Sequence, residues 1–287
     1  MIRFKAYAKL NLSLDITGKR GDGYHELDGI MQSISLCDTV EIEKTDDISV
    51  AMDVAGIDMR HNTAYKAALA FRQQTGCGGA CIHIEKHIPS EAGLGGASAD
   101  AAAVLCGLNK LYGTGLGTEE LCALGVTIGA DVPFALTGGT ARAKGVGERL
   151  TRIEPKIPLH FVIVKPHAGV STAEAFKRYK KSEPLHISTV EYALAKGDIA
   201  LFLRYAGNAL GMAALSIAPE IMTAANALMA AGAPRALMSG SGSTMFAPFG
   251  SLDEANEAAV RVKGDFAYVG AVSAVNTGIE EIVDGTF

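Results

Sequence analysis

Apolar and polar residues alternate from Phe4 to Ile16 with the two-residue period of a β-strand. A polar turn rich in glycine follows at residues 18–23, and further strands are expected around residues 30–44 and 48–54. Helical spacing then predicts a helix from Asn62 to Gln74. On the first strand, the two predicted faces are Leu10, Leu12, Leu14 and Ile16 on one side and Lys9, Asn11, Ser13 and Asp15 on the other.

A glycine-rich turn at residues 89–100, PSEAGLGGASAD, joins a predicted strand at Cys81–Glu85 to a predicted helix. Gly93, Gly95 and Gly96 can adopt positive φ and allow the backbone to approach a ligand closely. The unpaired N–H groups at the start of the helix, together with its dipole, favour an anion there. We therefore expect a phosphate-binding loop. The helix is predicted by an apolar stripe of Ala101, Val104, Leu105, Leu108, Leu111 and Tyr112.

Two common phosphate-loop motifs do not describe this turn. The chain contains no G-x-x-x-x-G-K-[ST] string, and Ser98 stands where the dinucleotide-binding fingerprint has its third glycine. A tight strand-to-helix turn without any ligand is the remaining alternative, and the turn by itself leaves that alternative open.

The rest of the chain reads as alternating helices and strands. A helix at 118–128 is interrupted at residues 129–134, which contain Pro133. The proline-rich stretch 155–158 is the best junction between two sub-domains, and a second glycine-rich turn, SGSGS, occupies 239–243. Strands are expected at 140–143, 160–165, 235–238, 243–248 and 266–271, and helices at 172–181, 188–196, 219–231 and 252–263.

Composition limits the possible functions. The 287 residues are 48% hydrophobic, enough for a sizeable core in two sub-domains. The 26 basic and 31 acidic residues give a net charge of −5, which argues against a nucleic-acid partner but permits a small anionic ligand.

Five irregularly spaced cysteines favour reduced thiols and a cytoplasmic location. Cys77, Cys81, His83 and His87 could form a zinc cluster, but ordinary packing is the favoured interpretation. The amino-terminal segment lacks the apolar core of a signal peptide. No stretch approaches the ~18 apolar residues of a membrane helix, so we expect no membrane partner.

Three segments together resemble the small-molecule kinase superfamily of galactokinase, homoserine kinase, mevalonate kinase and phosphomevalonate kinase (GHMP kinases). They are the strand with Lys9-Leu10-Asn11-Leu12, the loop near residue 90 and the loop near residue 240. The resemblance spans nearly the whole chain. It implies an α+β fold of two lobes, with a ribosomal-protein-like ATP-binding lobe at residues 1–155 and a ferredoxin-like α/β sandwich at 156–287.

Segments outside the glycine loops point to one branch of this superfamily. These are residues 8–14, Gly23-Tyr24-His25-Glu26-Leu27 and Gly129-Ala130-Asp131-Val132-Pro133. The resemblance implies that ATP phosphorylates the 2-hydroxyl of a cytidine diphosphate-linked sugar alcohol, 4-diphosphocytidyl-2-C-methyl-D-erythritol. This reaction belongs to the non-mevalonate route to isoprenoid precursors. A monomer or weak homodimer is expected.

The resemblance makes Lys9 and Asp131 the catalytic pair. Asp131 would orient the substrate hydroxyl and accept its proton, while Lys9 would favour the ionised carboxylate and offset charge on the transferred phosphoryl group. Taken as single residues, Lys9 could be a solvated lysine on the polar side of a strand, and Asp131 a turn or cap residue.

ATP and Mg²⁺ are the implied cofactors. Ser98 is the implied metal contact. Asp100 is an alternative metal contact, or its charge could interact only with the dipole of the helix. Asn62 could equally be a helix N-cap and Asn109 an exposed amide. The residues implied for ATP are Asn62, Lys86, Pro89, Gly93, Leu94, Gly95, Gly96, Ala97, Ser98 and Asn109.

For the acceptor, the resemblance implies that Tyr24 and Phe176 sandwich the cytosine ring and that His25 reads its edge. Tyr179, one helical turn from Phe176, could take the place of Phe176. Asn11 would contact the sugar-alcohol hydroxyls, and Gly240, Ser241 and Gly242 would lie at the diphosphate.

The sequence departs from the family pattern at a few positions. Ala97 and Ala99 replace glycine or serine, Ser243 replaces a common proline, and Glu91 adds a negative charge that we expect to point to solvent. Three other functions stay open on the sequence: another kinase of the superfamily or the related diphosphomevalonate decarboxylase, a non-catalytic nucleotide sensor, and an RNA-binding module.

Overall fold

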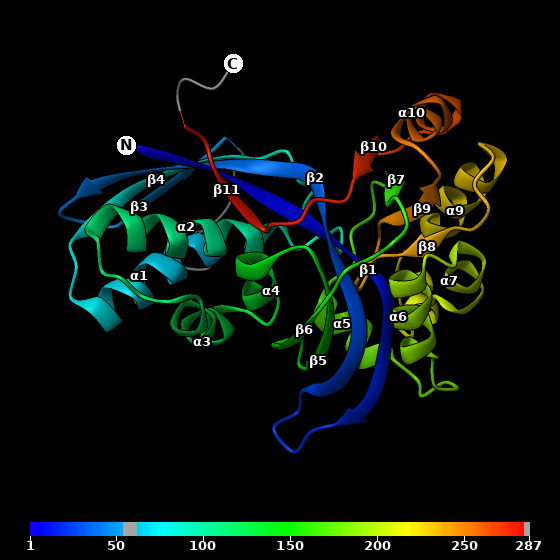
Figure 1. Ribbon diagram of the computed structural model, residues 1–287, viewed down its shortest axis with the longest axis horizontal. Helices are drawn as coiled ribbons and strands as arrows, with labels where there is room; N and C mark the ends of the chain where they lie inside the picture. The colour runs from blue at the N-terminus through cyan, green and yellow to red at the C-terminus, as the bar shows by residue number, and fades with distance from the viewer. Residues whose placement is uncertain (54–61, 284–287) are drawn as a thin grey trace.

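The computed structural model describes residues 1–53 and 62–283. Figure 1 shows two lobes side by side, each built on its own β-sheet and flanked by helices. The predicted arrangement of two α+β lobes is confirmed. The strand predicted at 48–54 is found at Ser49–Met52 (β3), and the last residue of that prediction, 54, lies outside the described part.

The first lobe contains a seven-stranded sheet. Its main path runs β11-β1-β2-β4-β3, and β5 joins through β2 and carries β6. The strands, besides β3, are β1 (Ile2–Lys19), β2 (His25–Thr45), β4 (Gly79–Glu85), β5 (Thr140–Gly145), β6 (Arg149–Ile153) and β11 (Ile279–Glu281).

Helices cover one face of this sheet, with α2 against β1 and β2 (Figure 1). Asn62 caps the first helix by accepting from the backbone N–H groups of Ala64 and Tyr65, so its predicted capping role is confirmed. The predicted stripe of α2 is buried at Ala101, Val104, Leu105 and Leu108. The helices of this lobe are α1 (Thr63–Thr75), α2 (Gly96–Tyr112), α3 (Thr118–Ile128) and α4 (Val132–Thr137).

The second lobe contains a four-stranded antiparallel sheet in the order β10-β7-β9-β8. Numbered along the chain, this is the order four-one-three-two of a ferredoxin-like sandwich, as predicted. Helices α9 and α10 pack on the sheet, while α6 lies against the long strands of the first lobe. The strands are β7 (His160–Lys165), β8 (Leu237–Met238), β9 (Met245–Phe249) and β10 (Tyr268–Ser273). The helices are α5 (Thr172–Arg178), α6 (Ile187–Lys196), α7 (Ile199–Tyr205), α8 (Gly211–Ile217), α9 (Glu220–Ala230) and α10 (Leu252–Arg261).

The two lobes share a hydrophobic core, and a strand that follows the second lobe in the chain joins the sheet of the first. The largest buried cluster continues from α1 and α2 to Phe161 and Phe246 of the second lobe. The chain then returns, and β11 pairs antiparallel with β1 in the first sheet (Figure 1). The division into residues 1–155 and 156–287 remains a prediction. Its boundary falls between β6 and β7, which belong to different sheets.

Strand β1 is buried on both faces, which its alternating sequence does not indicate. Lys9, Asn11, Ser13 and Asp15 are all less than one-tenth exposed. Ser13 and Asp15 contact the second lobe, where Ser13 donates to the carbonyl of Gly207 and Asp15 accepts from the N–H of Leu185. This end of the polar face is therefore a hydrogen-bonded contact between the lobes, as buried polar groups require, whereas Lys9 and Asn11 line a cavity.

Several elements differ from the predictions. The interruption after α3 is confirmed, but a short helix, α4, begins at once because Pro133 lies in its first turn, where proline is tolerated. The helix predicted at 172–181 ends at Arg178, because Tyr179 leaves the helical conformation. The short elements β6, α7, α8 and β11 were not predicted.

Two further predictions concern metals and membranes. Within residues 1–53 and 62–283, no group of three His, Cys, Asp or Glu side chains could hold a metal ion. Cys81 and His83 are exposed on β4. In the same part of the chain, no single helix has the length and hydropathy to cross a bilayer, although the bent pair α8 and α9 meets those criteria when taken together.

Candidate active site

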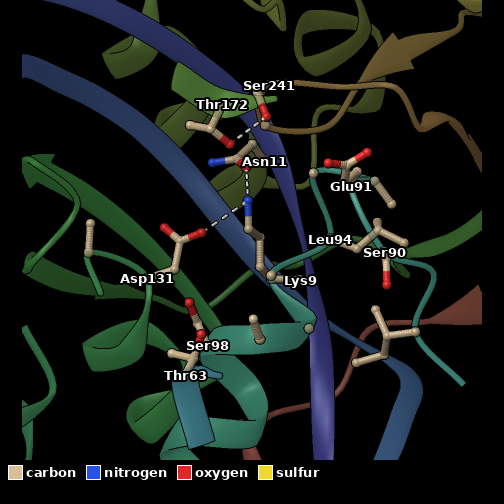
Figure 2. A pocket seen from close by; sticks show the side chains of 18 of the residues that line it. Lys9, Asn11, Thr63, Ser90, Glu91, Leu94, Ser98, Asp131, Thr172 and Ser241 are labelled. Atoms are coloured by element: carbon tan, nitrogen blue, oxygen red, sulfur yellow. Dashed lines mark hydrogen bonds and ion pairs between the residues drawn. The ribbon is translucent and has the colours of Figure 1, made fainter. Parts of the chain in front are cut away.

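A cavity of about 790 Å³ lies between the lobes and is lined by most of the predicted site residues. It is built from β1, the loop before α2, the start of α4 and the second glycine-rich turn (Figure 2). The predicted residues that line it are Lys9, Asn11, Asn62, Lys86, Pro89, Gly93, Leu94, Gly95, Gly96, Ala97, Ser98, Asp131, Phe176, Gly240 and Ser241.

Lys9 lies at the centre of a small polar cluster. Its Nζ donates to Oδ1 of Asn11 and lies 3.5 Å from Oδ2 of Asp131. The Lys9 side chain is 8% exposed, whereas that of Asp131 is 31% exposed and faces the cavity. Figure 2 shows the ammonium between the two partners. The simpler interpretation of Lys9 as a solvated strand residue is wrong, since burial and pairing hold its charge inside the cavity.

Local backbone geometry explains these positions. β1 has irregular register against β2 between Tyr7 and Lys9 and again between Asn11 and Ser13, so Lys9 and Asn11 lie between two bulges. Bulges re-aim side chains and occur often beside active sites. Asp131 occupies the N-cap position of α4, yet its side chain makes no capping hydrogen bond, which leaves the carboxylate to Lys9.

The glycine loop has the backbone geometry that phosphate binding needs. Gly93 and Gly95 adopt φ of 72° and 73°, and Gly95 is the N-cap of α2. Gly96 does not need positive φ. It is required for close packing instead, since a Cβ there would come within 3.0 Å of Ile88. The N–H of Lys9 donates to the carbonyl of Leu94 over 2.9 Å, which ties the loop to β1. The first hydrogen bonds of α2 are donated by the N–H groups of Ser98 and Ala99 to the carbonyl of Gly95, and Gly96 and Ala97, which precede them, line the cavity.

Lys86 is held by two buried carboxylates at the floor of the loop. Its Nζ donates to Asp38 and, over 2.7 Å, to Asp100. Burial disfavours the ammonium, but the carboxylates of Asp100 and Asp38 outweigh it and raise the pKa of Lys86. Burial also raises the pKa of Asp100, and Asp38 adds to the effect. Asp100 is thus a partner of Lys86 and also lines the cavity, so its predicted role at the metal or the helix dipole stays a prediction.

The second glycine-rich turn covers the cavity from the other lobe. Gly240 has a φ of 56°, which favours glycine, and a Cβ there would lie 3.0 Å from the carbonyl oxygen of Gly93 and 3.2 Å from Nζ of Lys9. The hydroxyl groups of Ser241 and Thr172 lie 3.0 Å apart. Thr172, at the start of α5, was missed in the sequence, because a hydroxyl at a short helix carries no motif.

A second cavity of about 1210 Å³ adjoins the first and shares Phe176 and Thr172 with it. Tyr24, His25, Phe176 and Tyr179 line this second cavity. The rings of His25 and Phe176 are stacked with centroids 5.0 Å apart, and Tyr179 lies edge-on to His25 at 6.2 Å. Burial, and then Lys19, lowers the pKa of His25, which favours the neutral ring.

Some predicted residues lie elsewhere. Asn109 does not line either cavity. Its amide is hydrogen-bonded to Leu116 and Thr114 in the turn after α2. Gly242, in the second turn, lines neither cavity and lies against Met238. Glu91 is exposed, as expected, but it lines the first cavity and its side chain packs against Gly169 of the second lobe. Asp38 was not singled out, since a lone aspartate within a predicted strand gives no signal.

Comparison with known proteins agrees with this arrangement. The family models described as "GHMP kinases N terminal domain" and "GHMP kinases C terminal" match residues 62–139 and 190–267. A homoserine kinase from Cytophaga hutchinsonii superposes with a TM-score of 0.78 over 98% of this chain and 97% of its own, at 20% identity. At that identity the likeness shows the fold alone, and the fold is that of the GHMP kinases.

Relatives at higher identity narrow the family. A 4-diphosphocytidyl-2-C-methyl-D-erythritol kinase of Pelotomaculum thermopropionicum is 43% identical over 265 residues, which cover 90% of this chain and 92% of the relative. A crystal structure of a 4-(cytidine 5'-diphospho)-2C-methyl-D-erythritol kinase matches with a TM-score of 0.78 at 35% identity, over 94% of this chain and 99% of that one. The chain therefore belongs to the 4-diphosphocytidyl-2-C-methyl-D-erythritol kinase family.

Proposed function

We propose that this protein transfers the terminal phosphoryl group of ATP to the 2-hydroxyl of 4-diphosphocytidyl-2-C-methyl-D-erythritol, a step of the non-mevalonate isoprenoid route. One observation carries the proposal. The pair of Lys9 and Asp131 lines the cavity that contains the glycine loop, and that cavity opens onto the aromatic second cavity. A phosphate donor and a nucleoside-linked acceptor can therefore meet at this pair.

The chemistry assigned to the pair is as follows. Asp131 orients the acceptor hydroxyl and takes its proton as the new O–P bond forms, and the bond from phosphorus to the bridging oxygen of ADP breaks. The Lys9 ammonium offsets negative charge on the transferred group. Asn11 orients the Lys9 ammonium through its Oδ1 and presents its amide to the sugar-alcohol hydroxyls.

ATP binding is assigned to the glycine loop and the floor beneath it. The phosphates would lie against Gly93, Leu94, Gly95, Gly96, Ala97 and Ser98, and the adenosine toward Asn62, Lys86 and Pro89, all of which line the first cavity. Asn109 is not retained, since its amide is occupied within its own turn.

The site fits a magnesium ion carried by the nucleotide. Ser98 and Asp131 supply hard oxygen atoms on the cavity wall, whereas Oδ2 of Asp100 is bonded to Lys86. We assign Ser98 as the protein contact. Mg²⁺ would supply charge neutralisation between the phosphate oxygens when bound.

The acceptor is assigned to the second cavity and to the part of the second glycine-rich turn that lines the first cavity. Tyr24 and Phe176 offer faces for the cytosine ring, and a neutral His25 offers one donor and one acceptor to its edge. Gly240 and Ser241 are assigned to the diphosphate, and Gly242, which lines neither cavity, is not retained. Because His25 and Phe176 already stack on each other, base binding between Tyr24 and Phe176 requires the His25 ring to turn aside.

The cellular setting is also part of the proposal. Five free cysteines and a net charge of −5 suit a reducing cytoplasm and a small-molecule partner, without nucleic acid or membrane. A monomer or weak homodimer is sufficient, because one chain supplies every assigned residue.

A comparison of three acceptors tests the proposal. Purified protein is incubated with MgATP and, in separate reactions, the cytidylyl sugar alcohol, homoserine and mevalonate diphosphate, and products are followed by phosphorus NMR. We expect ADP and a new phosphomonoester only with the cytidylyl sugar alcohol. Phosphorylation of homoserine alone, or nucleotide binding without turnover of any acceptor, would contradict it.

A further inference from the structure

Ser239 lies where three parts of the active site meet, although it does not line the cavity. The residue is fully buried at the start of the second glycine-rich turn. Its hydroxyl accepts from the backbone N–H of Asn11 over 3.1 Å and donates to the carbonyl of Gly93 over 2.9 Å. One hydroxyl in the second lobe is thus bonded to β1 and to the phosphate loop of the first lobe.

The phosphate loop and the turn around Ser239 are in close backbone contact. A Cβ on Gly93 would lie 2.2 Å from the carbonyl oxygen of Ser239, so the two chains pass with no room for a side chain. The N–H of Thr244 also donates to the carbonyl of Ala92 over 3.3 Å. The loop therefore rests on the second lobe along several residues.

The turn around Ser239 is itself fixed to β1. The amide of Asn208 donates to the carbonyls of Met238 and Gly240, on either side of Ser239. The segment carrying Asn208 pairs with β1, where Leu14 donates to Gly207 and accepts from Ala209. These hydrogen bonds fix the position of Ser239 relative to β1.

We infer that Ser239 is a positioning residue for phosphoryl transfer, and this inference rests on the proposed function. Its hydroxyl, which belongs to the second lobe, fixes the position of the phosphate loop relative to the Lys9–Asn11 segment of β1. Serine suits this place because its hydroxyl can accept one hydrogen bond and donate another. Removal of the hydroxyl leaves the Asn11 N–H and the Gly93 carbonyl unpaired in a buried place.

A matched control is available four residues away in the same turn. Ser243 is also fully buried, and its hydroxyl donates to the carbonyl of Ala168, so that its bond stays within the second lobe. Ser239→Ala and Ser243→Ala each delete one buried hydroxyl. Only the first deletion removes a bond to the loop and to β1.

The test compares the two variants with three readouts. For Ser239→Ala we expect kcat to fall at least about tenfold and the affinity for a non-hydrolysable ATP analogue to fall about fivefold. We also expect faster hydrogen exchange at the Asn11 amide. For Ser243→Ala we expect kcat and nucleotide affinity within about twofold of the parent, even if its melting temperature falls as much as that of Ser239→Ala. Ser239→Cys, of similar volume and weaker hydrogen bonding, carries the same test if the alanine variant does not fold.

The outcomes separate this inference from the proposed function. If the parent protein does not phosphorylate the cytidylyl acceptor, the proposed function fails, while nucleotide affinity and Asn11 exchange still test Ser239. If both serine variants lose kcat in proportion to lost stability, or if neither Ser239 variant changes nucleotide affinity and Asn11 exchange, the positioning role is wrong.

Discussion

Nζ of Lys9 lies 3.5 Å from Oδ2 of Asp131, and the two side chains come from opposite ends of the first lobe's sequence. One is held between two bulges of β1, and the other stands at the N-cap of a short helix without capping it. This pairing joins a buried ammonium to a carboxylate that remains open to the cavity. The carboxylate can therefore reach an acceptor while the ammonium stays desolvated.

Lys9→Met should remove the charge that the site uses against the transferred phosphoryl group. We expect kcat to fall about 10²–10³-fold, in the range seen when one preorganised electrostatic donor is deleted. Steady-state kinetics at saturating ATP and acceptor would measure it, with circular dichroism to verify the fold. A kcat within threefold of the parent would exclude Lys9 from the chemistry.

Phe176→Ala should weaken binding of the cytidine end more than Tyr179→Ala. Phe176 lines both cavities and lies parallel to His25, whereas Tyr179 lines only the second cavity and meets His25 edge-on. Stacking on an aromatic ring is worth about 1–3 kcal/mol per base, so KM for the acceptor should rise about 5–150-fold in the first variant. The reverse order of effects would assign the stacking role to Tyr179.

Acceptor binding should stay constant down to a pH below the ordinary histidine range. Burial and Lys19 lower the pKa of His25, so its ring in the folded protein becomes half charged only below about pH 6.5, where an ordinary histidine is half charged. KM for the acceptor should rise as pH falls, with a midpoint below pH 6.5. His25→Asn should abolish this rise, and KM for ATP serves as the internal control. A rise centred above pH 6.5 would contradict this description of the site.

Gly278→Ala should destabilise the protein through the returning C-terminal segment. A Cβ at Gly278 would lie 1.8 Å from the carbonyl oxygen of Ala135 in α4, and the carbonyl of Gly278 accepts from the N–H of Tyr7. Overpacking of this kind costs about 1–3 kcal/mol, so the melting temperature should fall by several degrees. Gly211→Ala is the matched control, since nothing lies within 4 Å of its added Cβ. Equal melting temperatures for the two variants would show that α4 does not depend on this contact.

Local patterns were sufficient to predict β1, the glycine loop and α2, but not α4, which carries Asp131. The alternation of β1, the glycine turn and the apolar stripe of α2 are short-range signals, and each produced the expected element. The order of the ferredoxin-like sheet, by contrast, came from the resemblance to a family. Sequence spacing does not say which strands pair.

The sequence could not show how the lobes meet. Lys9, Asn11, Ser13 and Asp15 alternate like a solvated face, but Lys9 pairs with Asp131, and the other three have partners in residues 185–239, which no local pattern connects to β1. Asp38 likewise acquires a role only when β2 brings it to Lys86. The three-residue strand β11 is too short for its periodicity to be recognised.

The most direct measurement of the central claim is single-turnover phosphoryl transfer by Asp131→Asn, with binding of an ATP analogue measured in parallel. The account predicts that transfer to the cytidylyl acceptor slows by about 10²–10⁴-fold, as expected for loss of a general base. Nucleotide affinity should stay within about threefold, because asparagine keeps the shape of the side chain and the glycine loop is untouched. The exposed Asp253→Asn should behave as the parent does. Transfer by Asp131→Asn at the parental rate would contradict the account.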